Sequence, residues 1–69
     1  MPKKTKPNNF TWENEGDRWE LFGSEGELVA TVEPEPGKAP GWWQMTSHTG
    51  IGLTGMQFDA AKAAAERLL

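Results

Sequence analysis

The 69-residue sequence contains no cysteine, a single histidine and no long apolar run. Without cysteine there is no disulfide, no thiol nucleophile and no cysteine-ligated zinc, and the composition suits a reducing cytoplasm. No apolar stretch approaches the ~20 residues of a membrane-spanning helix. The basic start MPKKTKPNN is not followed by the apolar segment of a secretory signal. We therefore expect a cytoplasmic protein with no membrane association.

Chemistry-bearing residues are equally scarce. His48 has no recognisable nucleophile and acid around it, and the carboxylates lack the spacing of a calcium-binding loop. The segment SHTGIGLTGMQF does contain G-x-G-x-x-G at Gly50, Gly52 and Gly55. A dinucleotide site also needs a parallel βαβ unit and an acid about 20 residues further on, beyond the last residue here. We predict a protein that is not an enzyme, with no metal, no cofactor and no small-molecule substrate.

Charge divides the chain into a basic start and an acidic first half. Residues 1–9 carry three lysines and no acid, and we predict a disordered basic tail there. Residues 10–69 are expected to form one domain. Within it, residues 10–37 hold Arg18 as their one cation against eight acids, a net charge of −7. These acids are Glu13, Glu15, Asp17, Glu20, Glu25, Glu27, Glu33 and Glu35.

Alternating apolar and polar residues from Phe10 onward indicate an antiparallel meander. A two-residue loop at Glu15-Gly16 predicts the following cross-strand pairs: Glu13 with Arg18, Trp12 with Trp19, and Phe10 with Leu21. A second turn at GSEG predicts these: Phe22 with Glu27, Leu21 with Leu28, and Trp19 with Ala30. Leu28, Ala30 and Val32 would then face the core and Val29 the opposite side.

The second half predicts a further strand and a helix. WWQMTSH is typical of a strand with Trp43 and Met45 inward. The glycine segment either turns or forms a short edge strand, with Ile51 and Leu53 inward. The segment FDAAKAAAERLL predicts a helix. We expect Asp59 as its N-cap and Phe58 packed on its first turn, with the following residues on its inner side: Ala61, Ala64 or Ala65, and Leu68. The predicted fold class is α+β, an antiparallel meander of three to four strands with one C-terminal helix on one face.

Adjacent tryptophans in a strand point to opposite faces, so Trp42 should lie on the face away from the helix. There it is either an exposed anchor for a partner or is covered by the loop of residues 34–41. The acids of this face and its turns are either a solvated surface or a docking surface for a basic partner. The candidate partner-binding residues are Glu13, Glu15, Asp17, Glu20, Phe22, Glu25, Glu27, Val29 and Trp42.

Two resemblances bear on function. The order of sheet, glycine-rich link and FDAAKAAAERLL resembles the three-strand-plus-helix DNA-binding domains of plant ethylene-response factors and integrase arm-binding domains. Those families read DNA with basic residues on the sheet, where this chain has glutamates, so nucleic acid is not the expected partner. In size, acidity and lack of cysteine, the chain also resembles small proteins of phages and mobile elements, including anti-CRISPR proteins.

From these features we expect a non-catalytic binding protein that presents an acidic, aromatic sheet face to a basic protein surface. Its most specific form is a nucleic-acid mimic, a phage-type inhibitor of a host nucleic-acid-binding complex. The alternative is a nucleic-acid-binding accessory domain that contacts phosphate through residues 1–9. The chain could also pair with a second copy of itself as a homodimer. The sequence leaves the partner, the source and the oligomeric state open.

Overall fold

The computed structural model describes residues 10–69, so the predicted basic tail of residues 1–9 lies outside the described residues. Five antiparallel strands form one sheet in the order of the chain, β1-β2-β3-β4-β5. They are β1 Thr11–Glu15, β2 Arg18–Phe22, β3 Leu28–Pro34, β4 Trp43–Ser47 and β5 Gly52–Met56. One helix, α1 (Phe58–Glu66), follows them. The predicted α+β meander is confirmed, but three to four strands was too few.

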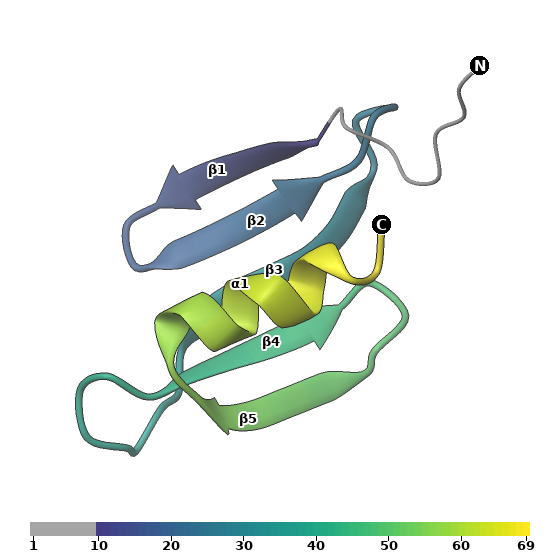
Figure 1. Cartoon of the computed structure of the whole chain (residues 1–69). Helices are drawn as coiled ribbons and strands as arrows, with labels where there is room; N and C mark the ends of the chain where they lie inside the picture. The colour runs from purple at the N-terminus through teal and green to yellow at the C-terminus, as the bar shows by residue number, and fades with distance from the viewer. Residues whose placement is uncertain (1–9) are drawn as a thin grey trace.

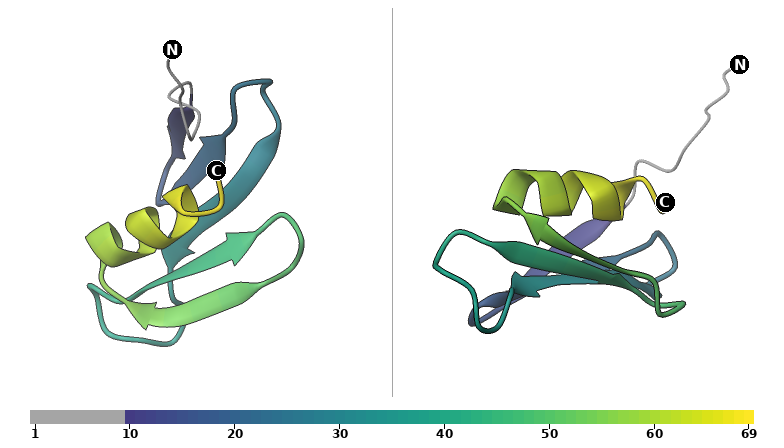
Figure 2. Two further views of the ribbon diagram at one scale, coloured as in Figure 1. Left: turned by 45° about the vertical axis from the view of Figure 1, so that its right-hand side comes forward. Right: turned by 90° about the horizontal axis from the view of Figure 1, so that it is seen from below.

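The helix lies on one face of a strongly twisted sheet, mainly over β3 and β4, and leaves the other face uncovered (Figures 1 and 2). The core between them is small and almost wholly aliphatic. It consists of Leu21, Val29, Ala30, Val32, Met45, Ala61 and Ala65. The two helical alanines are fully buried because their small side chains let α1 approach the sheet closely. Ala61 and Ala65 were predicted at these positions.

The first hairpin has a different register from the predicted one. Its loop is Gly16-Asp17, and Trp12 lies opposite Leu21 instead of Trp19. Gly16 adopts a φ of 62°, which glycine accepts without strain at the first position of a tight turn. The side-chain amide of Asn14 donates to the carbonyl of Gly16 at 2.9 Å and holds this turn in place. Since the shift is two residues, each side chain keeps its predicted face.

A bulge changes the second hairpin as well. The register shifts between Leu21, which pairs with Ala30, and Phe22, which pairs with Leu28. One extra residue in β3 breaks the strict alternation there. Val29 is consequently buried in the core, and Leu28 is 40% exposed. The sequence had predicted Leu28 in the core and Val29 on the opposite face, so the prediction was wrong for both residues.

The end of the chain departs from prediction in three places. Gln57 is the N-cap of α1, without a capping side-chain hydrogen bond, and Asp59 lies in the first turn instead. Leu68 is 45% exposed because α1 ends at Glu66, before the turn that would carry Leu68 inward. Ile51 and Leu53 are also exposed, because α1 covers β3 and β4 more than β5.

Aromatic side chains join the helix to the first hairpin. The ring of Phe58 lies 4.6 Å from that of Trp43 and 5.8 Å from that of Trp19, centroid to centroid. The ammonium of Lys62 lies 5.1 to 5.3 Å from the ring centroids of Trp12, Trp19 and Phe58. Trp12 Nε1 also donates a 2.9 Å hydrogen bond to Glu66. These contacts connect β1 and β2 to α1 in a region where the aliphatic core does not lie between them.

Replacing Lys62 with methionine should lower the free energy of unfolding by about 1–2 kcal/mol, because methionine keeps the apolar stem but removes the cation from three rings. Urea denaturation followed by tryptophan fluorescence measures this loss. Lys62→Arg is the matched control and should retain most of the stability, since a guanidinium also stacks on aromatic faces. Equal stability of the methionine variant and the wild type would show that the cation contributes nothing.

Candidate functional site

The sheet face away from the helix, called here the open face, is the candidate site. Its members alternate along four strands with the side chains that point to the core. They include Glu13, Glu15, Arg18, Glu20, Phe22, Thr31, Glu33, Gln44 and Thr46. Four carboxylates against one guanidinium give this face a net charge of −3. The acidic side chains predicted to gather on this face therefore lie on β1, β2 and β3.

Two of these carboxylates oppose each other directly. The register places Glu13 of β1 opposite Glu20 of β2, an arrangement that destabilises an antiparallel pair. Arg18 compensates part of this repulsion, since its Nη2 lies 3.6 Å from Glu20 Oε2 and 3.6 Å from Glu15 Oε1. Glu13 has no ion pair among residues 10–69. The open face therefore retains an electrostatic repulsion within the folded chain.

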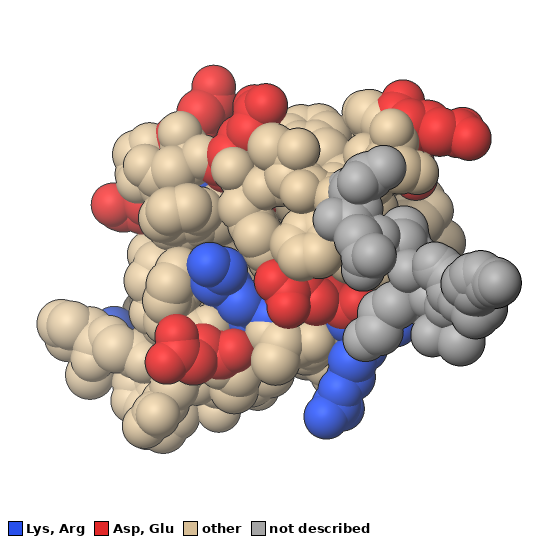
Figure 3. All heavy atoms as spheres, turned by 45° about the horizontal axis from the view of Figure 1, so that its top comes forward, with Lys and Arg blue, Asp and Glu red and all other residues tan. Residues whose placement is uncertain are grey.

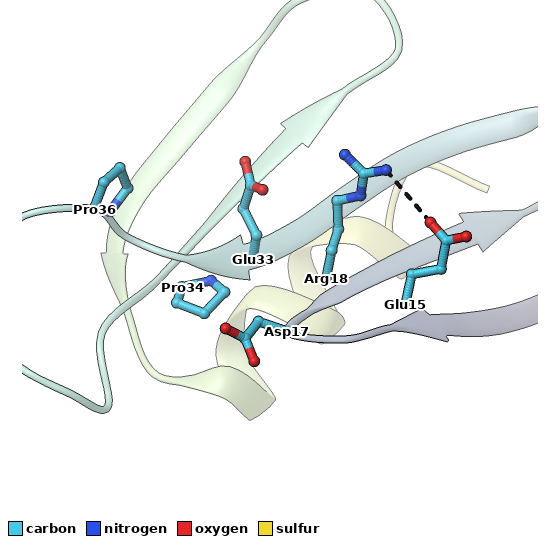
Figure 4. A pocket seen from close by; sticks show the side chains of 6 residues that line it. All are labelled: Glu15, Asp17, Arg18, Glu33, Pro34 and Pro36. Carbon is cyan, nitrogen blue, oxygen red and sulfur yellow. Dashed lines mark ion pairs between the residues drawn. The ribbon is translucent and has the colours of Figure 1, made fainter.

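The acidic character continues to one end of the sheet, where the surface is hollowed. An open hollow of ≈ 450 Å³ lies between the β1–β2 turn and the start of the β3–β4 loop (Figure 4). Its lining residues are Glu15, Asp17, Arg18, Glu33, Pro34 and Pro36. Glu33 is held on the open face by a 3.0 Å hydrogen bond from the amide of Gln44. Carboxylates and rigid proline rings thus surround the hollow.

Trp42 stands at the same end of the sheet. It immediately precedes β4, and its carbonyl accepts a 2.9 Å hydrogen bond from the amide of Glu35. The side chain is 43% exposed, so the loop of residues 34–41 flanks it without covering it. It lines a second hollow of ≈ 300 Å³ that shares Asp17 and Pro34 with the first. An aromatic side chain and the acidic end of the open face therefore adjoin.

Three of the predicted site residues do not belong to this surface. Glu25 and Glu27 lie in the β2–β3 turn, at the opposite end of the sheet from Trp42 (Figure 1). The carboxylate of Glu27 accepts a 3.1 Å hydrogen bond from the amide of Glu25 and so stabilises its own turn. Val29 is 6% exposed and cannot contact a partner. Phe22 is half-buried and lies at the Glu25 end of the open face.

Sequence reasoning missed Glu33 as a site residue and did not foresee the role of Glu35. Alternation along β3 could have placed Glu33 on the open face, two residues after Thr31. Glu35 has a structural role, since its carboxylate accepts a 2.8 Å hydrogen bond from the amide of Gly55 in β5 and lies 3.7 Å from the ammonium of Lys38. No pattern in the sequence indicates this contact between the loop and β5.

The charge is distributed unevenly around the molecule. In Figure 3, seen from the β1 edge and the helix side, acidic side chains project along the upper rim, and acidic and basic side chains lie together lower down. Of the four cations in residues 10–69, Lys62 lies in α1 and Arg67 directly follows it, where they balance the charges of Asp59 and Glu66. The acidic surface is therefore a property of the first three strands and not of the whole domain.

Among residues 10–69, no group of three or more histidine, aspartate and glutamate side chains could hold a metal ion. His48 is exposed, with Nδ1 3.2 Å from the carbonyl oxygen of Val29.

The glycines of the G-x-G-x-x-G segment belong to the β4–β5 hairpin. Gly50 occupies the left-handed position of its turn, with a φ of 96°, and donates its amide to the Ser47 carbonyl at 2.9 Å. Gly55, with a φ of 72°, lies at the register shift between β4 and β5. Positive φ at a turn and a bulge accounts for both residues, in an antiparallel hairpin and not a βαβ unit.

Over residues 10–69, no helix has the length and apolar character needed to cross a membrane. Comparisons with protein-family models, with curated proteins and with solved structures find no match to this chain.

Proposed function

We propose that this chain is a non-catalytic binding protein that docks the acidic end of its open face, together with Trp42, on a basic surface of a protein partner. The observation that supports this proposal is the pairing of Glu13 with Glu20 on the uncovered face of the sheet. A face selected only for stability and solubility would gain by an opposite charge at either position. A cationic partner removes the repulsion on binding, so the cost in the free protein becomes a gain in the complex.

The surface combines the two properties that protein partners use. Carboxylates on neighbouring strands steer a cationic partner toward the face, an effect that speeds association. Trp42 supplies the aromatic anchor, since exposed tryptophans are frequent among the residues that dominate binding energy. The most specific form of this function is a phage-type inhibitor that occupies the nucleic-acid-binding surface of a host complex, where its carboxylates replace phosphates. The net charge of −3 on the open face disfavours nucleic acid itself as the ligand.

Replacing Glu13 with lysine should have opposite effects on stability and on binding. The free energy of unfolding should rise by about 0.2–1 kcal/mol, because lysine opposite Glu20 converts repulsion into attraction. The wild type should itself gain stability as salt is added, since exposed charges are screened over about 8–10 Å near physiological ionic strength. Urea denaturation at low and high salt measures both effects.

The same variant tests the function in a capture experiment. Immobilised wild-type protein should retain a basic protein from a lysate of its native host, and Glu13→Lys should not. Asp59→Lys is the matched control, because it makes the same change in net charge at an exposed position on the helix side. The partner should be retained by this control. Loss of the partner with both variants would indicate a nonspecific charge effect. Retention with both variants would show that the acids of the open face do not bind the partner and are only a solvated surface.

A further inference from the structure

The two edges of the sheet are protected to different degrees. An edge strand exposes unpaired backbone groups that can pair with another chain, and charged side chains are a common defence. The β1 edge carries Glu13 and Glu15. The β5 edge, Gly52–Met56, contains no charged residue. Leu53 is 44% exposed in β5, and Ile51 just before it is 60% exposed.

The backbone of β5 is oriented for pairing on its outer side. The carbonyl of Ile51 accepts a 2.7 Å hydrogen bond from the amide of Ser47, so the backbone groups of Ile51 point toward β4. In an antiparallel ladder this direction alternates from one residue to the next. The amide and carbonyl of Gly52 therefore point away from β4, toward the open edge. The first residues of β5 thus present a free donor and acceptor beside apolar side chains.

We propose that β5 pairs antiparallel with β5 of a second copy of the chain and forms a two-fold symmetric dimer with one continuous sheet. An antiparallel pairing of a strand with itself is self-complementary, as a two-fold interface requires. Electrostatics favours this edge over every other part of the sheet for self-association. Residues 10–69 carry ten acids and four cations, a net charge of −6, so two copies repel wherever their acids meet.

Pairing through β5 keeps those acids apart. The nearest acid of the open face is Glu33 on β3, and the two β3 strands of the dimer would be five strand spacings apart, about 24 Å at about 4.8 Å each. This separation exceeds the screening length of about 8 Å at physiological ionic strength. Glu35 is closer to β5, but its charge is compensated by Lys38 and by the amide of Gly55. The contact is small, so association should be weak, with dimer forming in the upper micromolar range.

The dimer would also determine how the open faces are arranged. The two-fold axis between antiparallel strands runs perpendicular to the sheet, so both helices lie on one side and both open faces on the other. Two acidic surfaces, each with its Trp42, would then face the same direction. This arrangement suits a partner with two basic sites or a symmetric partner. The arrangement of faces rests on the proposed function, but the pairing of β5 does not.

Sedimentation equilibrium of the full chain, from micromolar to millimolar concentration, tests the pairing without any partner. The wild type should change from the 7.6 kDa of one chain to twice that mass as concentration rises. Leu53→Lys places a charge at the pairing edge and should weaken the dimer at least about tenfold. Thr54→Lys is a second variant at the same edge, with near-ultraviolet circular dichroism to verify that each remains folded. Thr11→Lys is the matched control on β1 and should not weaken dimerisation.

Hydrogen exchange locates the contact. The amide of Gly52 should exchange more slowly at high than at low wild-type concentration, and this difference should disappear in Leu53→Lys. A wild type that stays monomeric to millimolar concentration would overturn the proposal. So would assembly beyond the dimer, or a dimer that the β1 variant weakens as much as the β5 variants do. If the chain dimerises as expected but the capture experiment fails, the proposed function is rejected and the pairing of β5 is not.

Discussion

Replacing Trp19 with alanine should leave the protein unfolded or nearly so at 37 °C. The half-buried indole packs on Phe58 at a centroid distance of 5.8 Å and lies 5.2 Å from the ammonium of Lys62, so one substitution removes two contacts between β2 and α1. Truncation of a packed tryptophan costs about 3–5 kcal/mol. A domain of this size has little stability beyond that, because a small chain buries a modest share of its surface. Thermal denaturation followed by far-ultraviolet circular dichroism measures the effect.

Trp42→Ala is the matched control for this experiment. Trp42, just before β4, is 43% exposed and is not among the residues packed on the core. Its truncation should change the free energy of unfolding by less than about 0.5–1 kcal/mol. If Trp19→Ala unfolds at the same temperature as Trp42→Ala, the aromatic contacts between β2 and α1 do not stabilise the fold.

The faces of the first strands were predictable, and the cross-strand pairs were not. Alternation assigns a face through a period of two, so the error of two residues in the first hairpin left Trp12, Trp19 and Leu21 on the core side. Register depends instead on the residues that make the turn. Gly16 and Asp17 make it, with the side chain of Asn14 bonded across it, and several neighbouring polar residues would suit a turn equally well in sequence.

Two further errors arise where tertiary structure overrides local pattern. The bulge in β3 exchanges the environments of Leu28 and Val29, and nothing in the alternating sequence marks the extra residue. The glycine segment has weak intrinsic preference for a strand, yet β5 forms because Glu35 and β4 supply partners for its backbone. Contacts between residues 20 positions apart, such as Glu35 with Gly55, are not encoded in a local pattern.

The site acids of β1 and β2 were predictable, and the behaviour of the acids in the β2–β3 turn was not. Glu13, Glu15 and Glu20 are on the open face because strand periodicity fixes their direction. A glutamate in a turn can fold its carboxylate back onto nearby amides, as Glu27 does, and this choice depends on turn geometry. The hollows beside Trp42 also arise from the approach of the β1–β2 turn to the β3–β4 loop, which only the folded chain shows.

The largest functional effect is expected from Trp42→Ala on the complex with the basic partner. Loss of an anchor residue costs about 2 kcal/mol or more, which corresponds to about a thirtyfold weaker affinity. This loss should appear almost entirely as faster dissociation, because the anchor is engaged only after the two surfaces have docked. The Trp42→Ala variant should remain folded, as expected from its small effect on the free energy of unfolding. Surface plasmon resonance with the captured partner gives both rate constants.

Glu13→Lys should change the other rate constant. Long-range attraction acts on the approach of the partner, so this reversal should slow association and reduce its dependence on salt, with a smaller effect on dissociation. Measurements at two salt concentrations separate the two variants, since the dissociation rate of Trp42→Ala should be nearly independent of salt. If both substitutions change the same rate constant with the same salt dependence, steering by the acids and anchoring by Trp42 are not separate functions of this surface. If neither changes the affinity, the partner binds elsewhere on the molecule.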